Sequence, residues 1–535
     1  LQGRGRMASA ALAALFFVQP ALALHGAARP AVRARAATQI LSHADAPSLF
    51  PPADVRRSLD RELGAIALPS LAALSCENLL SLVDTLYIGR LGAVQMGAAG
   101  VGIAATYSFA KLFGDPLTKT STSLVAGKEG DDLLSSVLAA LALALFLGLV
   151  QTTAFTLFAP RIVSGFGAAA TSPLAAPAAS YLRLRSLGAP AVTLLLVMQG
   201  IYRGLGDTLT PLLCTLSGAA VNAVLDPILI FRFGLGCSGA AAATAVANYV
   251  SAVPLLVLLI RRLSTTNAAS SRGRLRLPPA RSLRSAARGY VSAGATIYVR
   301  TVGKLWGYSY AARAATSLGP VPAAAYALTF QLGVATTQLC EAVSLAMQAL
   351  LSRELNRYSA LVASLAGRES TSSSPTGSKS FEPKSTVATT AEAASCQANA
   401  RHVLRRGLLL GGSFASALSL ITWACRRAAV GALTSNLEVR EAAVAVMPLV
   451  LVTQVLKGLA YPSNAVLMGG SDWLASTIAM WASSAVLVCL LTSGVLGVGL
   501  APVWAALAAC FAMQVCTAMG RVISKTGPWR VLRRS

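Results

Sequence analysis

The sequence predicts an all-α, polytopic membrane protein of twelve transmembrane helices arranged as two six-helix bundles. Apolar residues make up 55% of the 535 positions and charged residues only 12%, about half the charged share of an average soluble domain. Apolar runs long enough to cross a bilayer, which takes about 20 residues, recur along the chain. Short glycine motifs also recur in the same order in the two halves of the chain.

Residues 1–58 are predicted to be a targeting region without stable structure. The apolar run after Met7, ASAALAALFFVQPALAL, is too short to span comfortably and ends in small residues, like a secretory signal cleaved after Ala23. An Arg-rich segment without acids follows as far as Asp45, which is typical of a transit peptide. A signal followed by a transit sequence favours the envelope of a plastid behind additional membranes. The alternatives are a signal anchor, a disordered tail, and residence in another endomembrane or the plasma membrane.

Residues 59–261 are predicted to form the N-terminal six-helix bundle. Its apolar spans lie near residues 63–88, 94–118, 132–158, 178–202, 209–231 and 238–260. The first span contains Pro69, which removes a backbone donor and allows the helix to bend. It also places Glu77 and Asp84 inside an apolar run, where a carboxylate is costly unless it is paired or protonated. The first span therefore favours a proton- or cation-driven transporter, the alternative being acids that a neighbouring helix caps.

Residues 287–524 are predicted to form the C-terminal six-helix bundle, after a basic loop at 262–286. Its spans lie near residues 288–311, 321–350, 404–430, 440–468, 473–496 and 500–523. A Ser/Thr-rich insert near 357–400 is predicted to be disordered, and residues 525–535 form a basic tail.

The basic residues outside the spans indicate the orientation of the chain. The loop between the bundles, the insert and the tail are rich in Arg and Lys, and with twelve spans they share one side with both termini. The positive-inside rule places that side in the cytoplasm or in the stroma of a plastid. The net charge of +25 therefore reflects topology and contact with membrane lipid, and we expect no nucleic-acid partner.

Three short motifs repeat at matching ranks in the two bundles. The pairs are Leu91–Val94 with Leu318–Val321, Gly204–Asp207 with Gly469–Asp472, and Gly234–Gly236 with Gly497–Gly499. Three matches in the same order indicate an internal parallel repeat. Such a six-plus-six repeat is typical of transporters whose substrate cavity lies between the bundles.

The residue types inside the spans argue against other classes of membrane protein. The three histidines, His25, His43 and His402, lie outside the spans, so carboxylates must carry any protons. The nine cysteines show no C-x-x-C spacing, which favours ordinary core thiols over disulfides or zinc. A membrane-embedded enzyme would need clustered His, Cys or nucleophile–base pairs, and an ATP-driven pump would need G-x-x-x-x-G-K-[ST], which is absent. We expect no catalytic residue, no cofactor and no metal other than a coupling ion.

Several motifs resemble the multidrug and toxic compound extrusion (MATE) family, closest to its DinF-type branch of bacteria and plant organelles. They are SLVDTLYIGRLG in the first span, QGIYRGLGDTLTP after the fourth and NAVLDPILIF in the fifth, with weaker matches in AAAYALTFQL, AMQALL and LMGGSDW. The resemblance spans roughly Arg61 to Arg521. It implies a monomeric secondary antiporter that exports an organic cation, phenolic or carboxylate in exchange for H⁺ or Na⁺. A lipid-linked-saccharide flippase of the same superfamily, which would need a wider and more cationic cavity, is the alternative.

Two carboxylates of the N-terminal bundle are candidates for ion coupling. Asn222 and Asp226 are four residues apart and therefore share a helical face. If that face meets Asp84, two carboxylates in a low-dielectric pocket cannot both ionise cheaply, so one takes up H⁺ or the pair binds Na⁺. The resemblance implies that Asp84, Asn222, Asp226 and Thr244 form this cluster. The alternative for Asn222 and Asp226 is helix capping before Pro227.

The resemblance also implies polar positions that line a cavity of the N-terminal bundle, Tyr181 and Gln199, for which plain packing is the alternative. It further identifies Pro69 as the residue at which the first helix bends. Glu77 lies two helical turns before Asp84, so we place it near the cavity and leave its role open.

The C-terminal bundle departs from the family pattern. Span seven has no acid and span ten has Asn464 where an acid is frequent, so a second cation site of that kind is not expected. Its spans carry charged residues, among them Arg300 and Lys304 on span seven and Glu341 on span eight. We expect Arg300 and Glu341 to form a structural charge pair, since pairing is the economical way to bury both. Direct binding of substrate is the alternative.

Overall fold

The protein is described from a computed structural model. The structure describes residues 51–89, 91, 93–165, 171, 173–268, 279–372, 383–433 and 437–532. Within these ranges some side chains are outside the description, among them those of residues 76–86. The predicted targeting region up to residue 50 likewise lies outside the described residues.

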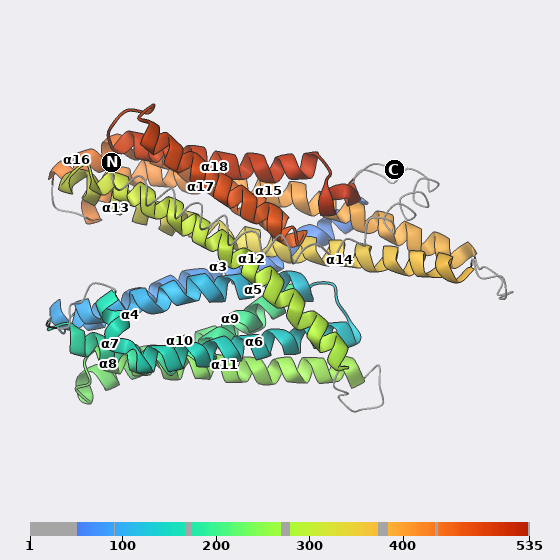
Figure 1. Ribbon diagram of the computed structural model, residues 1–535, viewed down its shortest axis with the longest axis horizontal. Coiled ribbons are helices and arrows are strands. Elements are labelled where there is room, and N and C mark those ends of the chain that lie inside the picture. The colour runs from blue at the N-terminus through green and yellow to red at the C-terminus, as the bar shows by residue number, and fades with distance from the viewer. Residues whose placement is uncertain are drawn as a thin grey trace.

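The described residues are almost wholly helical, with no strand among them (Figure 1). The first half of the chain forms α3 (Ala53–Gly89), α4 (Ala93–Phe109), the π-helix η1 (Ala110–Gly114), α5 (Asp115–Val125), α6 (Gly130–Leu157), α7 (Ala159–Gly165), α8 (Ala175–Ser186), α9 (Ala189–Gly204), α10 (Leu209–Pro227), the π-helix η2 (Ile228–Arg232) and α11 (Cys237–Ala268). The second half forms α12 (Ala280–Thr316), α13 (Pro320–Gln338), α14 (Glu341–Ser372), α15 (Pro383–Leu433), α16 (Leu437–Gly469), α17 (Trp473–Ser493), α18 (Leu500–Ile523) and the 3-10 helix η3 (Gly527–Leu532).

The helices form two groups with separate hydrophobic cores. In Figure 1, α4 to α11 lie together below and α13 to α18 lie together above. The first group has a core that includes the buried side chains of Ile201 and Leu255, and the second has one that includes Met447 and Leu487. The helices α3, α5, α12 and α14 contact elements of both groups, so they form the junction.

The described helices fall on the twelve predicted spans when each broken or bent pair is taken as one span. Seven are long and apolar enough to cross a membrane alone, namely α6, α10 with η2, α11, α15, α16, α17 and α18, and the α8–α9 pair, bent by 51°, makes an eighth. The other four predicted spans are α3, α4–η1–α5, α12 and α13–α14, which are broken or carry charged side chains. Polarity is therefore concentrated in the spans that form the junction.

Two of these junction spans are interrupted at equivalent places in the repeat. After α4, the π-helix η1 begins at Ala110, and α5 begins at Asp115. In the second half, α13 ends at Gln338 and α14 begins at Glu341, so the predicted span 321–350 is two helices rather than one. Each break places a carboxylate in the first turn of the following helix.

The repeated Gly-Asp motifs make equivalent ion pairs at one end of the molecule. Asp207 pairs with Arg262 at the end of α11, with Nη1 to Oδ2 at 3.2 Å. Asp472 pairs with Arg521 at the end of α18, with Nε to Oδ2 at 2.9 Å. We call this end the basic end; the loops at 126–129, 205–208 and 470–472 lie there. The repeat found in the sequence thus extends to side-chain contacts.

The segments predicted to lie outside the membrane are more helical than expected. The insert predicted to be disordered near 357–400 is instead the end of α14 and the start of α15, apart from the stretch 373–382, which is not described. The two helices pack together, and the burial of Ala393 and Cys396 explains why the described part of this segment is helical.

Helices also extend into the predicted loop, the predicted tail and the predicted targeting region. α11 continues to Ala268 and α12 begins at Ala280, inside the predicted loop 262–286. α3 begins at Ala53, inside the predicted targeting region. The predicted tail forms η3, whose Trp529 is fully buried.

An ion-pair network around one buried acid ties α3, α14 and α15 together at the basic end. Arg353 Nη2 lies 2.7 Å from Glu62 Oε2, and its Nε lies 3.1 Å from Glu354 Oε1. Asn399 Nδ2 donates to the other oxygen of Glu354 at 3.1 Å. The Glu354 side chain is 3% exposed. Burial disfavours the charged form of Arg353, but its two acidic neighbours outweigh that effect and raise the pKa of the guanidinium.

Arg353→Leu is expected to destabilise the protein by roughly 3 kcal/mol, because it leaves the Glu354 carboxylate buried without its cationic partner. The measurement is the thermal unfolding temperature of the purified protein in detergent. The combined Arg353→Leu, Glu354→Leu variant should recover part of the loss. A double variant that loses as much as the sum of the two single changes would show that the pair is not coupled.

Candidate functional site

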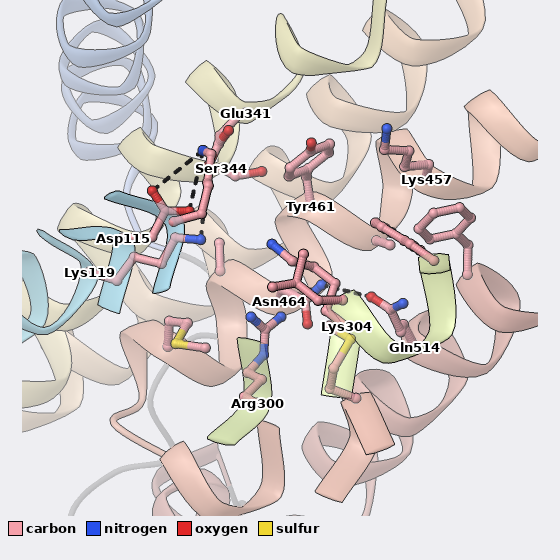
Figure 2. A pocket seen from close by; sticks show the side chains of 18 of the residues that line it. Asp115, Lys119, Arg300, Lys304, Glu341, Ser344, Lys457, Tyr461, Asn464 and Gln514 are labelled. Atoms are coloured by element: carbon pink, nitrogen blue, oxygen red, sulfur yellow. Dashed lines mark hydrogen bonds and ion pairs between the residues drawn. The ribbon is translucent and has the colours of Figure 1, made fainter. Parts of the chain in front are cut away.

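A cavity of about 290 Å³ lies at the junction of the two groups. Its walls come from α4, η1 and α5 on one side and from α12, α13, α14, α16, α17 and α18 on the other. Figure 2 shows side chains from these elements converging on the space. The two helix breaks at Asp115 and Glu341 both lie on its lining, so interruption of the spans places polar groups at the cavity.

The lining carries five cationic side chains and two acidic ones. The cations are Lys111, Lys119, Arg300, Lys304 and Lys457, and the acids are Asp115 and Glu341. Buried charges in a membrane protein are costly unless partners are supplied, so this excess of positive charge marks the cavity as a candidate functional site.

Two of the five cations are paired with the two acids. Lys111 Nζ lies 3.4 Å from Asp115 Oδ2, one helical turn away. Lys119 Nζ of α5 lies 4.0 Å from Glu341 Oε1 of α14, which links the two groups of helices (Figure 2). Each acid thus has a lysine within ion-pair distance.

The other three cations have no carboxylate within ion-pair distance among the described residues. Arg300 and Lys304 lie one turn apart on α12, and Arg300 is 5% exposed with no hydrogen-bond partner for Nε in the described part of the chain. Lys457 of α16 places its ammonium 5.9 Å from the centre of the Phe330 ring. These three side chains are available to a negatively charged ligand.

Neutral polar groups complete the lining. Asn464 Nδ2 donates to Gln514 Oε1 at 3.2 Å, and the hydroxyl-bearing side chains of Tyr308, Tyr461 and Ser344 also line the space. Asn464 stands at the position where the family often has an acid, and its amide bonds to Gln514 instead of forming a carboxylate site. The second group therefore presents amide and hydroxyl groups beside its cations.

The expected charge pair between Arg300 and Glu341 is not formed. Both residues line the cavity, but the partner of Glu341 is Lys119. The prediction was wrong because it considered only the second bundle, whereas the break at Glu341 faces α5 across the junction.

Sequence reasoning missed four of the charged residues of the cavity: Lys111, Asp115, Lys119 and Lys457. The internal repeat could have found one of them. Asp115 follows Leu91 at nearly the same spacing as Glu341 follows Leu318, so the acid noted on span eight has a counterpart on span two. No motif in the sequence points to Lys457 on span ten.

The predicted coupling residues lie within the first group. Asp226 is fully buried and Asn222 is 5% exposed, both on α10. Asn222 Nδ2 has no hydrogen-bond partner among the described residues. The hydroxyl of Thr244, on the neighbouring α11, donates to the Ala240 carbonyl of its own helix at 2.8 Å. The side chains of Asp84 and Glu77 are outside the description, so the meeting of the two carboxylates stays a prediction.

The two residues predicted to line a cavity of the first group do not line the cavity at the junction. Tyr181 is 1% exposed and belongs to a hydrophobic core, with its hydroxyl accepting from Arg185 Nη1 at 3.1 Å. Gln199 Nε2 approaches Thr215 Oγ1 at 3.5 Å on the neighbouring helix. In this structure Tyr181 is therefore a packed core residue, which is the alternative given above.

Pro69 lies inside α3, which is continuous from Ala53 to Gly89. Because proline has no N–H, the carbonyl four residues earlier loses its helical donor. That carbonyl belongs to Ala65, and the hydroxyl of Thr208 donates to it at 3.2 Å. Thr208 is 8% exposed and belongs to the loop between α9 and α10. The threonine of the GDT segment therefore supplies the hydrogen bond that the proline removes.

Thr208→Val is expected to lower the thermal unfolding temperature, because it removes the hydrogen bond that replaces the one lost at Pro69, a bond worth about 0.5–1.5 kcal/mol. Valine keeps the shape of threonine, so packing is preserved. Thr208→Ser keeps the hydroxyl and should behave as the unmodified protein. Equal unfolding temperatures for the valine and serine variants would show that the hydroxyl does not stabilise α3.

Known proteins provide relatives over most of the chain. The MatE family model matches residues 69–228 and 385–492, together half of the chain. Protein DETOXIFICATION 44, chloroplastic, of Arabidopsis thaliana is 28% identical and covers 88% of this chain and 84% of its own. Protein DETOXIFICATION 43 of the same plant is also 28% identical, over 89% of this chain and 93% of its own.

Solved structures show the same fold. A MOP superfamily transporter from Pyrococcus furiosus matches with a TM-score of 0.70 at 16% identity, over 89% of this chain and 97% of that one. The eukaryotic MATE transporter AtDTX14 matches with a TM-score of 0.65 at 16% identity, over 89% and 98%. The chain therefore belongs to the MatE family, the multidrug and toxic compound extrusion transporters, and is an efflux transporter rather than an enzyme.

Proposed function

We propose that this transporter exports a small organic anion with two or three negative charges, in exchange for H⁺ or Na⁺, across a plastid envelope. The observation that carries the proposal is the charge balance of the cavity, with five cationic side chains against two acidic ones. An organic cation would add to an existing positive excess, whereas a carboxylate would neutralise it.

The arrangement of the three cations that have no carboxylate partner among the described residues supports an anion with more than one charged group. Arg300 and Lys304 share one face of α12, and Lys457 approaches from α16. A guanidinium can hold a carboxylate through two parallel hydrogen bonds, and an ammonium can serve a second carboxylate as a point charge. Three cations on two walls thus suit a di- or tricarboxylate.

The size of the cavity supports a small substrate. Sites for drug-sized ligands usually measure about 300–1,000 Å³, and this cavity, at about 290 Å³, lies at the lower limit of that range. A compact polycarboxylate fits such a volume. The same comparison disfavours the large aromatic cations that a multidrug exporter would carry.

The coupling ion is proposed to act in the first group, away from the cavity. Asp226 is fully buried on the same helical face as Asn222. A buried carboxylate that gains and loses a proton, or binds and releases Na⁺, changes the charge of its helix group during each cycle. Opening of the junction first at one end and then at the other would then exchange ion for substrate.

The plastid envelope is proposed from the leader sequence and from the names of relatives. The proteins DETOXIFICATION 44 and DETOXIFICATION 45 of Arabidopsis thaliana are both named chloroplastic. We expect residues 1–60 fused to a fluorescent protein to direct it to plastids. A fusion that stays in the cytosol or at the plasma membrane contradicts the placement, while the fluorescent protein alone serves as the control.

The proposed function is tested with the purified full-length chain in proteoliposomes. Uptake is measured for citrate, malate, salicylate and tetraphenylphosphonium under an imposed pH gradient, an imposed Na⁺ gradient, or neither. We expect gradient-dependent movement of citrate or malate and none of tetraphenylphosphonium. Movement of the organic cation without that of any anion would overturn the proposed substrate class.

A lipid-linked-saccharide flippase is the second candidate, because its pyrophosphate would also suit a cationic cavity. The small volume of about 290 Å³ is the observation against it. Liposomes that contain a fluorescent polyprenyl-pyrophosphate saccharide distinguish the two. Translocation of that lipid, without uptake of citrate or malate, would favour the flippase.

A further inference from the structure

Two polar stripes, one on each side of the junction, run from the cavity to the basic end. Residues at intervals of four form each stripe, and this spacing keeps them on one helical face. On α5 they are Asp115, Lys119 and Ser123, and on α14 they are Ser344, Gln348, Ser352 and Asn356. Ser123, Gln348 and Ser352 are at most 3% exposed. The two helices contact each other, so the stripes are buried between the groups.

Hydrogen bonds join the stripes along their length. Gln348 Nε2 donates to Ser123 Oγ at 2.9 Å and to the Lys119 carbonyl at 3.0 Å. Asn356 Nδ2 donates to the carbonyls of Ser123 at 2.9 Å and Ala126 at 2.6 Å. Such bonds exchange readily for bonds to water. When α5 and α14 part, these groups can therefore bond to water instead.

Arg203, in the last turn of α9, lies beside this junction. The residue is 9% exposed, and its Nε and Nη1 have no hydrogen-bond partner in the described part of the chain. The next residue, Gly204, is packed so closely that a Cβ there would lie 2.8 Å from the Thr122 carbonyl oxygen of α5. The helix that carries Arg203, α9, contacts both α5 and α14.

Guanidinium nitrogens that are buried without hydrogen-bond partners, as Nε and Nη1 of Arg203 are among the described residues, are costly. The proposed substrate would remove this cost if it reached Arg203 in another state of the cycle. The chemistry that a guanidinium recognises best is a carboxylate or a phosphate, which it binds with two parallel hydrogen bonds.

We propose that Arg203 binds the transported anion on its way to the cavity, when the stripes of α5 and α14 part at the basic end. The inference rests on the proposed function for the class of ligand. With the stripes joined, as in this structure, the guanidinium is sealed off. With the stripes parted, hydroxyl and amide groups line a path that has Arg203 on its wall and Lys119 at its inner end.

The first test asks whether the joined stripes cover Arg203, and it requires no substrate. In the full-length Ser123→Cys, Gln348→Cys variant, a short bifunctional methanethiosulfonate reagent bridges the stripes and a reductant releases them. Phenylglyoxal modification of Arg203 is then measured by peptide mass spectrometry, with the wild-type chain treated identically. We expect at least tenfold more modification after release, and protection by 10 mM citrate.

Each other outcome overturns part of the inference. Equal modification before and after release, or none in either state, would show that the stripes do not control access to Arg203. Modification after release without protection by citrate, malate or inorganic phosphate would show that Arg203 is not an anion-binding residue. Failure of the proposed function is separate: wild-type proteoliposomes would then move no anion, whatever the modification pattern.

The second test compares the two sides of the membrane. Arg203→Gln should raise KM for citrate presented at the basic end at least tenfold and leave KM at the opposite side within twofold. Arg203→Lys should recover part of the loss, because it keeps a cation. Arg261→Gln removes an exposed arginine at the same end and is the matched control. Equal increases on both sides for Arg203→Gln would assign the residue a merely structural role.

Discussion

Lys304→Met should lower kcat/KM for citrate transport by about 10- to 150-fold, because a hydrogen bond to a charged group is worth about 1.5–3 kcal/mol. Arg300→Met should have a similar effect, since the two residues share one face of α12 and face the same cavity. Methionine keeps most of the side-chain length and removes the charge. The measurement is gradient-driven uptake in proteoliposomes, normalised to folded protein.

The controls separate charge from packing. Lys304→Arg keeps the positive charge and should retain most of the activity. Arg288→Met removes an exposed cation near the start of α12 and should leave uptake unchanged. Undiminished citrate uptake in both Lys304→Met and Arg300→Met would place the anion elsewhere. Better transport of tetraphenylphosphonium in these variants would identify the lysine and arginine as the source of selectivity.

Asp226→Asn should abolish accumulation of substrate against its gradient while leaving binding of citrate intact. The amide mimics the protonated, ion-loaded carboxylate, so the charge at this position can no longer change during the cycle. Because Asp226 is fully buried in the first group and does not line the cavity, the anion site is untouched. We expect citrate–citrate exchange to continue within about twofold while gradient-driven uptake falls to the level without a gradient.

Asp131→Asn is the matched control, because it removes an exposed carboxylate at the start of α6. It should leave both measurements unchanged. Gradient-driven accumulation that survives in Asp226→Asn would move ion coupling out of the first group. Since Asp115 and Glu341 are the acids of the cavity, their amide variants would be the next to measure.

The architecture followed from the sequence because the relevant signals are local. Long apolar runs place helices, and the Gly-Asp motifs at Asp207 and Asp472 mark equivalent turns that make equivalent ion pairs. The partner of Glu341 could not be found in this way, because Lys119 is more than two hundred residues away and meets it only across the junction. The helices at 357–372 and 383–400 were missed because Ser/Thr-rich composition does not reveal that α14 and α15 pack against each other.

Buried charged residues could be predicted from the sequence where a charged side chain stands in an apolar run. Asp226 and Arg300 are charged groups in apolar sequence, and both are buried. Asp115 is also a charged residue inside a predicted span. It was overlooked because its importance is visible only when it is compared with Glu341 in the internal repeat. The bond between Thr208 and the carbonyl of Ala65 joins two motifs that looked independent in the sequence, the proline of the first span and the GDT segment.

The pairing of α14 with α15 has a practical consequence for imaging. With a rise of about 1.5 Å per residue, the 32 residues of α14 and the 51 residues of α15 are about 48 Å and about 77 Å long, against a hydrocarbon core of about 30 Å. In Figure 1 both extend past the other helices at the basic end. This hairpin would project from a detergent micelle as a rigid rod, and would give single particles of an otherwise featureless transporter a direction by which to align them.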